Sequence, residues 1–183
     1  MLFREMPLKG AYLIEPEPRY DERGSMARTF CRREFEAHGL NPFIAQCSLS
    51  SNRYRGTIRG LHYQIEPYAE TKLLSCIKGA IYDVIIDLRH ESPSFGQWTA
   101  IELRAADRLL LYVPQGFAHG FQTLENNSEV FYQISQFYQP AFARGLRWND
   151  PAFNIKWPLK LVNISEQDCS WPLFSPYREK ANA

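Results

Sequence analysis

Two of the four histidines lie in sequence contexts where an imidazole could do chemistry. His62 stands in "GTIRGLHYQ" (56–64) and His119 in "PQGFAHGF" (114–121), each beside glycines in a strand-like run. An imidazole titrates near neutral pH and can act as a general base. One isolated histidine in a strand is more often a hydrogen-bonded core or rim residue. Two such strands in one small domain favour a polar pocket that both of them line.

Basic residues close to His62 could hold an anion in the same pocket. Arg59 precedes His62 by three positions, so regular strand alternation would put the two side chains on opposite faces. Gly60 between them predicts a β-bulge that brings both side chains to one face. Lys72 opens the next strand-like run, where its ammonium group could stabilise a developing oxyanion.

A histidine base needs a carboxylate that fixes its tautomer and stabilises the imidazolium. Asp83, Asp87 and Asp168 are the candidates for this partner of His62. Sequence spacing alone does not rank them, so all three stay open at this point.

A tyrosine could supply the opposing acid. In "EVFYQISQFY" (129–138) the two-residue period of a strand places Tyr132 and Tyr138 on one face. Tyrosines on an apolar face more often belong to a core, but a phenol that points into a pocket can donate a proton.

Short strands dominate the elements that must position these residues. Runs rich in β-branched and aromatic residues follow one another, with Gly, Pro, Asn or Asp at most of the breaks. The predicted strands are 43–50, 56–64, 71–78, 80–89, 97–104, 109–114, 119–124 and 129–138. Short strands at regular spacing predict an antiparallel sandwich or barrel.

Helix signals are sparse. About two helical turns are expected in "CRREFEAHGL" (31–40), which ends at a glycine. The proline-interrupted tail from position 149 onward is predicted to wrap the barrel, with a turn at "ISEQD" (164–168).

The chain has the size and composition of one globular domain. Of its 183 residues, 45% are hydrophobic and 22% charged, and no repeat or linker divides 1–183. The formal net charge of +1 gives no reason to expect nucleic acid or a membrane surface as partner. No N-terminal apolar stretch is long enough for a signal peptide or a spanning helix. Four cysteines without regular spacing indicate free, mostly buried thiols, so we predict a cytoplasmic location.

One motif indicates a particular barrel architecture. "PQGFAHG" (114–120) matches the P-x-G-x-x-H signature of cupins, small β-barrels whose second motif brings a histidine inside. The first cupin motif supplies two more histidines and a glutamate. In "HYQIEPYAE" these places hold His62, Gln64 instead of the second histidine, and Glu70. Imidazoles are the usual ligands of transition metals, so we expect a polar pocket without a metal.

Taken in order along the chain, a longer series of motifs resembles one enzyme family. The motifs are "DERG" (21–24), "GTIRGLHYQ" (56–64), "ETKLLSCIKGAIYDVIIDLR" (70–89), "SPSFGQW" (92–98), "YVPQGFAHGFQTL" (112–124), "VFYQISQFY" (130–138), "RWNDPAF" (147–153) and "ISEQD" (164–168). Over nearly the whole chain they are similar to the dTDP-4-dehydrorhamnose 3,5-epimerase family of deoxysugar biosynthesis.

The resemblance implies an all-β fold, a cupin-like jelly-roll β-barrel with few short helices. It also implies a homodimer with exchanged N-terminal strands, no metal and no cofactor. The implied substrate is a nucleotide-diphosphate sugar, a 4-keto-6-deoxy sugar whose protons at C3 and C5 are removed and returned on the opposite face.

The resemblance also implies a role for each site residue. His62 would be the base, Asp168 its orienting carboxylate and Tyr132 the acid on the other side of the sugar. Lys72 would stabilise the enolate oxygen at C4. Arg23, Arg59 and His119 would hold the diphosphate and sugar, with Gln46 and Ser48 nearby. We add Arg28 and Tyr138 of this chain as candidate binding residues.

The chain departs from the family pattern at two positions. Arg28, in "RGSMAR", takes the place of the usual Glu in R-G-x-F-x-E, and Ala143 takes that of a second expected Glu. The family's acidic groups lie on the nucleotide and sugar side. An Arg offers only donors where a Glu accepts, so we expect this chain to bind dTDP no better than CDP or GDP.

Three other functions compete with epimerisation. A ketoisomerase of the same fold works from one face, whereas this chain retains both His62 and Tyr132. A non-catalytic sugar-binding cupin would be expected to have lost His62, Lys72 or Tyr132. A metal-dependent cupin oxygenase would need bound iron or manganese.

Overall fold

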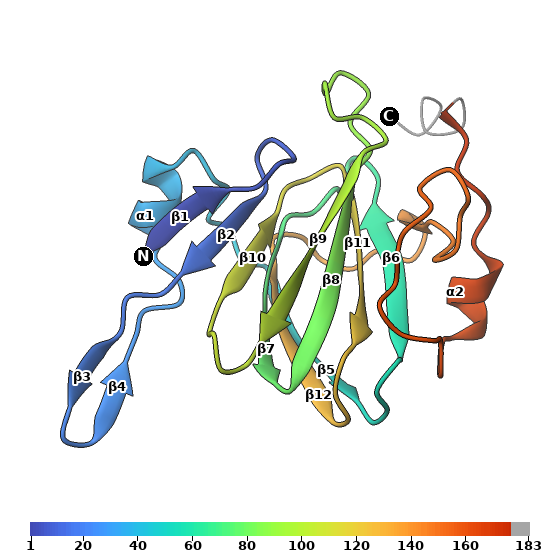
Figure 1. The fold of residues 1–183 in the computed structure, drawn as a ribbon. Helices are drawn as coiled ribbons and strands as arrows, with labels where there is room; N and C mark the ends of the chain where they lie inside the picture. The colour runs from blue at the N-terminus through green and yellow to red at the C-terminus, as the bar shows by residue number, and fades with distance from the viewer. Residues whose placement is uncertain (177–183) are drawn as a thin grey trace.

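The computed structural model, shown in Figure 1, describes residues 1–176 of the chain and is built almost entirely from β-strands. The strands are β1 (Leu2–Glu5), β2 (Tyr12–Glu15), β3 (Arg19–Asp21), β4 (Gly24–Met26), β5 (Gln46–Asn52), β6 (Ile58–Gln64), β7 (Lys72–Lys78), β8 (Ala80–Asp87), β9 (Trp98–Arg104), β10 (Leu110–Val113), β11 (Phe117–Thr123), β12 (Ser128–Ile134) and β13 (Ala143–Gly145). The helices described are α1 (Arg32–Ala37) and α2 (Glu166–Ser170).

Two antiparallel sheets face each other. One has the strand order β1-β2-β10-β7-β12-β5 and the other the order β13-β6-β11-β8-β9, while β3 and β4 form a separate hairpin. The hairpin projects away from the barrel on the side of the N-terminus (Figure 1). These sheets confirm the predicted all-β class, and every strand predicted from 43 to 138 is present with its ends moved by a few residues.

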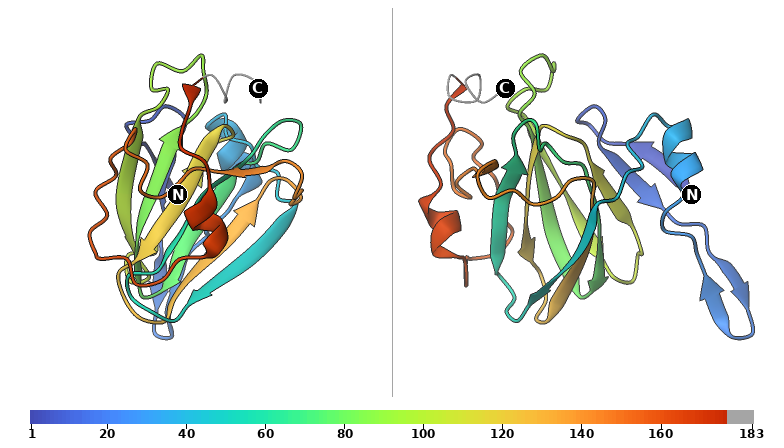
Figure 2. Two further views of the ribbon diagram at one scale, coloured as in Figure 1. Left: turned by 90° about the vertical axis from the view of Figure 1, so that its right-hand side faces the viewer. Right: turned by 180° about the vertical axis from the view of Figure 1, so that it is seen from behind.

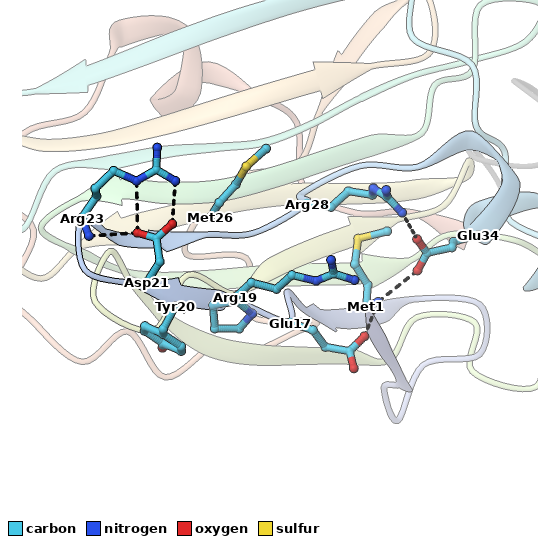
Figure 3. Close-up of a pocket in the computed structure, with 10 residues that line it drawn as sticks. Met1, Glu17, Arg19, Tyr20, Asp21, Arg23, Met26, Arg28 and Glu34 are labelled. Atoms are coloured by element: carbon cyan, nitrogen blue, oxygen red, sulfur yellow. Dashed lines mark hydrogen bonds and ion pairs between the residues drawn. The ribbon is translucent and has the colours of Figure 1, made fainter.

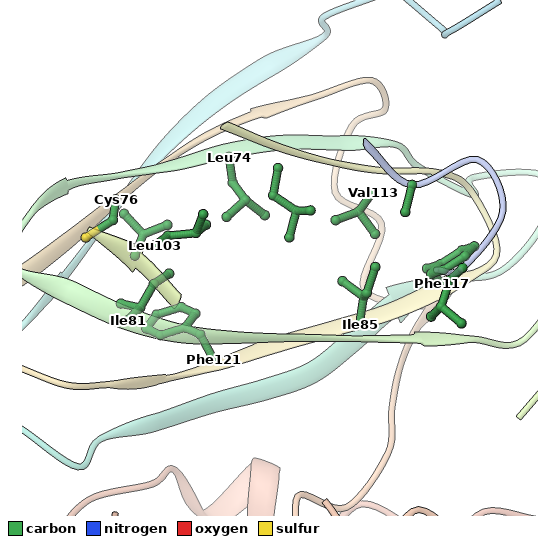
Figure 4. Packing of buried hydrophobic residues seen from close by; sticks show 12 residues of the cluster. Leu74, Cys76, Ile81, Ile85, Leu103, Val113, Phe117 and Phe121 are labelled. Atoms are coloured by element: carbon green, nitrogen blue, oxygen red, sulfur yellow. The ribbon is translucent and has the colours of Figure 1, made fainter. Parts of the chain in front are cut away.

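The main core fills the space between the two sheets (Figure 4). Leu74 on β7 and Leu111 on β10 face Ile81 and Ile85 on β8 and Phe121 on β11, all with at most 1% of their surface exposed. Alternation along each strand therefore points every second residue into the barrel.

The outer face of the five-stranded sheet is covered by the C-terminal part of the chain. Leu61 and Tyr63 on β6 belong to an apolar cluster with Phe153, Trp157 and Phe174. Figure 2 shows this segment running along the side of the barrel next to β6. The predicted wrapping of the tail is confirmed, and it brings the far C-terminal residues to the back of the strand that carries His62.

Two local predictions were wrong, and the sequence pattern did not locate the four N-terminal strands. The segment 164–168 begins a short helix, α2, because Ser165 caps it by accepting a hydrogen bond from the Asp168 N–H at 3.1 Å. Strand β12 ends at Ile134, so Tyr138 lies beyond the strand and shares no strand face with Tyr132. The N-terminal strands β1–β4 were not predicted, because they are short and rich in exposed polar residues.

The cysteines are free but mostly not buried, contrary to expectation. Cys76 is buried, Cys31 is half-buried, and Cys47 and Cys169 are exposed. The reducing compartment therefore stays a prediction. Within residues 1–176, no helix has both the length and the apolar character needed to cross a membrane.

Candidate active site

Strand β6 carries the predicted bulge between its two polar residues. His62 pairs with His119 of β11 and Arg59 with Phe121, so one residue of β11 stands opposite two of β6. Gly60 makes this possible, since its φ is 115° and a Cβ atom there would lie 2.6 Å from the Cα of Gly120. Arg59 and His62 consequently line the same cavity of about 410 Å³.

Helix α2 supplies the carboxylate that sequence spacing could not choose. His62 Nε2 lies 2.6 Å from Asp168 Oδ1, across 106 positions of sequence. The Asp168 side chain is 6% exposed and that of His62 is 46% exposed. A carboxylate only accepts hydrogen bonds, so Nε2 carries the hydrogen and Nδ1 has the free lone pair. This hydrogen bond leaves Nδ1 of His62 as the nitrogen that could accept a proton.

Asp168 is fixed by further donors. The Gly60 N–H donates to Oδ2 at 3.2 Å and the Trp171 indole donates to Oδ1 at 3.3 Å. Burial by itself would raise the pKa of Asp168. The hydrogen bond and positive charge of His62, together with the hydrogen bonds from Gly60 and Trp171, instead lower this pKa below its ordinary value. The carboxylate is thus ionised and can stabilise an imidazolium.

The other two candidate carboxylates have different partners. Asp87 is bound by Arg89, whose Nη2 lies 2.8 Å away, and by the hydroxyls of Ser92 and Ser94. Asp83, inside the barrel, accepts a hydrogen bond from His119 Nε2 at 2.9 Å. Neither carboxylate is the partner of His62.

Tyr132 comes from the sheet opposite His62. It packs against the core between the sheets, and its ring meets the His119 ring edge-on with centroids 5.9 Å apart. Burial raises the pKa of the Tyr132 phenol well above 10, the charge of Asp83 raises it further, and Arg59 opposes the shift. The phenol is therefore protonated at neutral pH and able to act as an acid.

Lys72 lies at the start of β7 and is almost fully buried, with 8% of its surface exposed. Its Nζ donates to the backbone carbonyl of His62 at 3.1 Å and forms an ion pair of 2.8 Å with Glu70. The Lys72 ammonium is thus held directly beside the strand segment that carries His62.

Two predicted binding residues lie on the edge strand next to Tyr132. On β5, Ser48 pairs with Tyr132 and Gln46 pairs with Ile134. Gln46 Oε1 also accepts a hydrogen bond from the Tyr138 N–H at 3.2 Å. Tyr138 itself, after the end of β12, is 58% exposed at the rim.

Two predicted binding residues, Arg23 in the turn between β3 and β4 and Arg28 just after β4, lie apart from this group within one chain. Arg23 and Arg28 line a separate cavity of about 850 Å³ under β3 and β4 (Figure 3). Arg23 pairs with Asp21 at 2.6 Å, and Arg28 pairs with Glu34 at 3.1 Å. The structure therefore brings together the residues from β5, β6, β7, β11, β12 and α2, and leaves Arg23 and Arg28 outside.

Sequence reasoning missed two residues that shape the site. Trp171, at the C-terminal end of α2, donates its indole N–H to Asp168. Gly145 on β13 leaves room for the Trp171 ring, because a Cβ atom at position 145 would lie 2.3 Å from that ring. A lone Gly before the tail and a lone Trp within it give no spacing signal. Among residues 1–176 no group of three His, Cys, Asp or Glu side chains is arranged to hold a metal ion.

Comparison with known proteins decides the family. The family model described as dTDP-4-dehydrorhamnose 3,5-epimerase matches residues 5–176. The chain belongs to the dTDP-4-dehydrorhamnose 3,5-epimerase family. The dTDP-4-dehydrorhamnose 3,5-epimerase of Methanothermobacter thermautotrophicus is 40% identical over 97% of this chain and 95% of its own length.

Solved structures of the same family confirm the predicted cupin-like fold. The enzyme from Elizabethkingia anophelis superposes with a TM-score of 0.93 at 36% identity, covering 100% of this chain and 99% of the other. A dTDP-6-deoxy-D-glucose-3,5-epimerase from Legionella pneumophila, in complex with dTDP-4-keto-L-rhamnose, gives a TM-score of 0.88 at 32% identity, with 94% and 92% of the two chains covered. Membership in the epimerase family confirms that the chain is an isomerase-class enzyme.

Proposed function

We propose that this chain inverts C3, C5 or both in a dTDP-linked 4-keto-6-deoxy sugar, with His62 as the base and Tyr132 as the acid. The observation that carries the proposal is the 2.6 Å contact between His62 and buried Asp168 beside a cavity that Arg59 also lines. The substrate class follows from the dTDP-4-keto-L-rhamnose bound to the relative from Legionella pneumophila.

The chemistry begins with loss of a proton next to the ketone. His62 Nδ1 takes the proton from C3 or C5, and the C–H electron pair moves into an enolate whose charge lies on the C4 oxygen. Lys72 stabilises that oxygen, since a buried ammonium acts strongly on a developing negative charge. Asp168 stabilises the imidazolium that forms.

Inversion requires that the new proton arrive on the opposite face. Tyr132 donates it, because its sheet lies across the barrel from the strand of His62 and its phenol is protonated at neutral pH. After one turnover His62 carries an extra proton and Tyr132 has lost one. Since His62 is 46% exposed, it gives its extra proton to water, and Tyr132 takes one up from water before the next turnover.

The test is solvent exchange with a dTDP-linked 4-keto-6-deoxy sugar in D₂O, read by NMR and mass spectrometry. Deuterium at C3, C5 or both, together with inverted product, supports epimerisation and identifies the carbons. Carbonyl movement to a neighbouring carbon would indicate a ketoisomerase instead. Binding without exchange would indicate a sugar-binding protein.

We further propose that the functional unit is a homodimer in which the β3–β4 hairpin of one chain completes the site of the other. The hairpin projects from the barrel and carries Arg23, whose side chain is 89% exposed. Mixed dimers of Arg23→Ala and His62→Ala chains provide the test. They should regain one intact site and about half of the wild-type activity, since one site then has both residues. No recovery would mean that each chain works alone.

A further inference from the structure

Lys72 forms an ion pair with Glu70, a residue that has no role in the proposed proton transfers by His62 and Tyr132. Its Nζ lies 2.8 Å from Glu70 Oε1, and the two side chains are 9% and 10% exposed. The same ammonium donates to the His62 carbonyl at 3.1 Å. An ammonium group has three hydrogens to donate, so these two contacts leave one for a substrate oxygen.

The second oxygen of Glu70 is held as well. Gln64 Nε2 donates to Glu70 Oε2 at 2.8 Å. Gln64 is 4% exposed, and its Oε1 accepts from the Gln139 N–H at 2.7 Å. Glu70 therefore cannot turn away from Lys72 without breaking a buried hydrogen bond to Gln64.

A lysine side chain is otherwise a poor fixed donor. It has a flexible four-carbon stem and a compact charge, and it can satisfy its donors in many directions. Stabilisation of an enolate needs a donor that already points to the place where the charge develops. In this chain the pair of contacts to Glu70 and to the His62 carbonyl supplies that orientation.

We propose that Glu70, held by Gln64, is a positioning residue that fixes the Lys72 ammonium with one hydrogen directed at the C4 oxygen of the substrate. The inference rests on the proposed function, because it assumes that Lys72 acts on the enolate. It adds a further, largely buried carboxylate to the site beside Asp168, one that acts through its ion pair with Lys72.

The test compares Glu70→Gln, which keeps the shape and removes the charge, with wild type. The rate of deuterium wash-in at saturating substrate should fall about ten- to a hundredfold, as expected when a catalytic group is misplaced by about 1 Å. KM should change little, because the lost interaction is made with the enolate and not with the bound ketone. Glu91→Gln, at an exposed glutamate, is the matched control and should keep the wild-type rate.

A double-variant experiment separates positioning from a general loss of structure. Lys72→Met should lower the rate of deuterium wash-in. Adding Glu70→Gln to Lys72→Met should not lower that rate further, because Glu70 acts only through Lys72 and the double variant leaves no unpaired charge buried. A wild-type rate for Glu70→Gln beside a slow Lys72→Met would overturn the inference, as would a further loss in the double variant. A wild-type rate for Lys72→Met would instead refute the proposed role of Lys72.

Discussion

Replacing Asp168 by Asn tests how strongly the rate of proton removal by His62, the proposed base, depends on its buried carboxylate partner. The substitution keeps one acceptor oxygen but removes the charge that faces His62 Nε2 at 2.6 Å. A hydrogen bond to a charged group contributes about 1.5–3 kcal/mol. That free energy corresponds to about a ten- to a hundredfold fall in the rate of proton removal. The lower end is expected, because His62 is 46% exposed and water screens part of the effect.

The structure also predicts a loss of stability in Asp168→Asn. Asp168 accepts from the Gly60 N–H and from the Trp171 indole, whereas an Asn amide group turns its NH₂ toward one of these donors or toward His62. One buried donor left without an acceptor costs about 1–3 kcal/mol of the free energy of unfolding.

The assay pairs deuterium wash-in with urea unfolding. Trp171→Phe is the control, since it removes one donor at 3.3 Å and keeps the carboxylate, and it should lose much less rate. A wild-type rate in Asp168→Asn would refute the role of the dyad. A loss as large as that of His62→Ala would show that the imidazole does nothing without Asp168.

Three further predictions follow from particular groups of the site. In wild type the pKa of Asp168 is lower in the folded state than its ordinary value of 3.8, so the folded chain binds this proton less tightly than the unfolded chain. The ionised Asp168 therefore stabilises the fold above pH 3.8, and this stabilisation is lost as the pH falls below that value. The difference in unfolding free energy between wild type and Asp168→Asn, followed by urea titration, should therefore shrink as the pH falls from about 5 to about 2. Tyr132→Phe should keep deuterium wash-in by His62 while inverted product falls, and equal loss of both, measured by NMR, would assign the phenol a structural or binding role. Contrary to the expectation drawn from Arg28 in the sequence, calorimetry should find that dTDP binds more tightly than CDP, GDP or UDP, because Glu34 lies 3.1 Å from Arg28 and leaves a carboxylate acceptor in that cavity. Equal affinities for the four nucleotides would contradict the proposed dTDP-linked substrate.

The sequence predicts the barrel well because its strands show a strong local pattern. Runs rich in β-branched and aromatic residues, with Gly, Pro, Asn or Asp at most of the breaks, predict the strands from β5 to β12. Gly60 between Arg59 and His62 predicts the bulge, since a strand needs an irregular residue to turn two side chains three apart to one face. Local chemistry is sufficient for these features.

The sequence does not rank the carboxylates because the choice depends on packing over a long distance. Asp168 reaches His62 only after the tail has covered the outer face of the five-stranded sheet and α2 has formed beside β6. The period of two also extended β12 too far, to Tyr138, although the strand ends at Ile134. Trp171 lies only three positions from Asp168, but its ring also packs against Gly145 of β13, and no signal in the sequence indicated that long-range contact.

Arg23 and Arg28 show a different limit. Both were predicted in the site, yet in one chain Arg23 lies in the turn of the projecting hairpin, Arg28 follows β4, and the two line their own cavity. Their role in substrate binding remains a proposal, tied to the proposed dimer.

Deuterium wash-in by His62→Ala is the most direct test of the central claim, that this imidazole removes the protons next to the ketone. The variant is incubated with a dTDP-linked 4-keto-6-deoxy sugar in D₂O, and its circular dichroism is compared with that of wild type to verify folding. The proposed mechanism predicts that exchange at both C3 and C5 falls to the uncatalysed level while the fold is intact. Exchange that continues near the wild-type rate in the folded variant would contradict it.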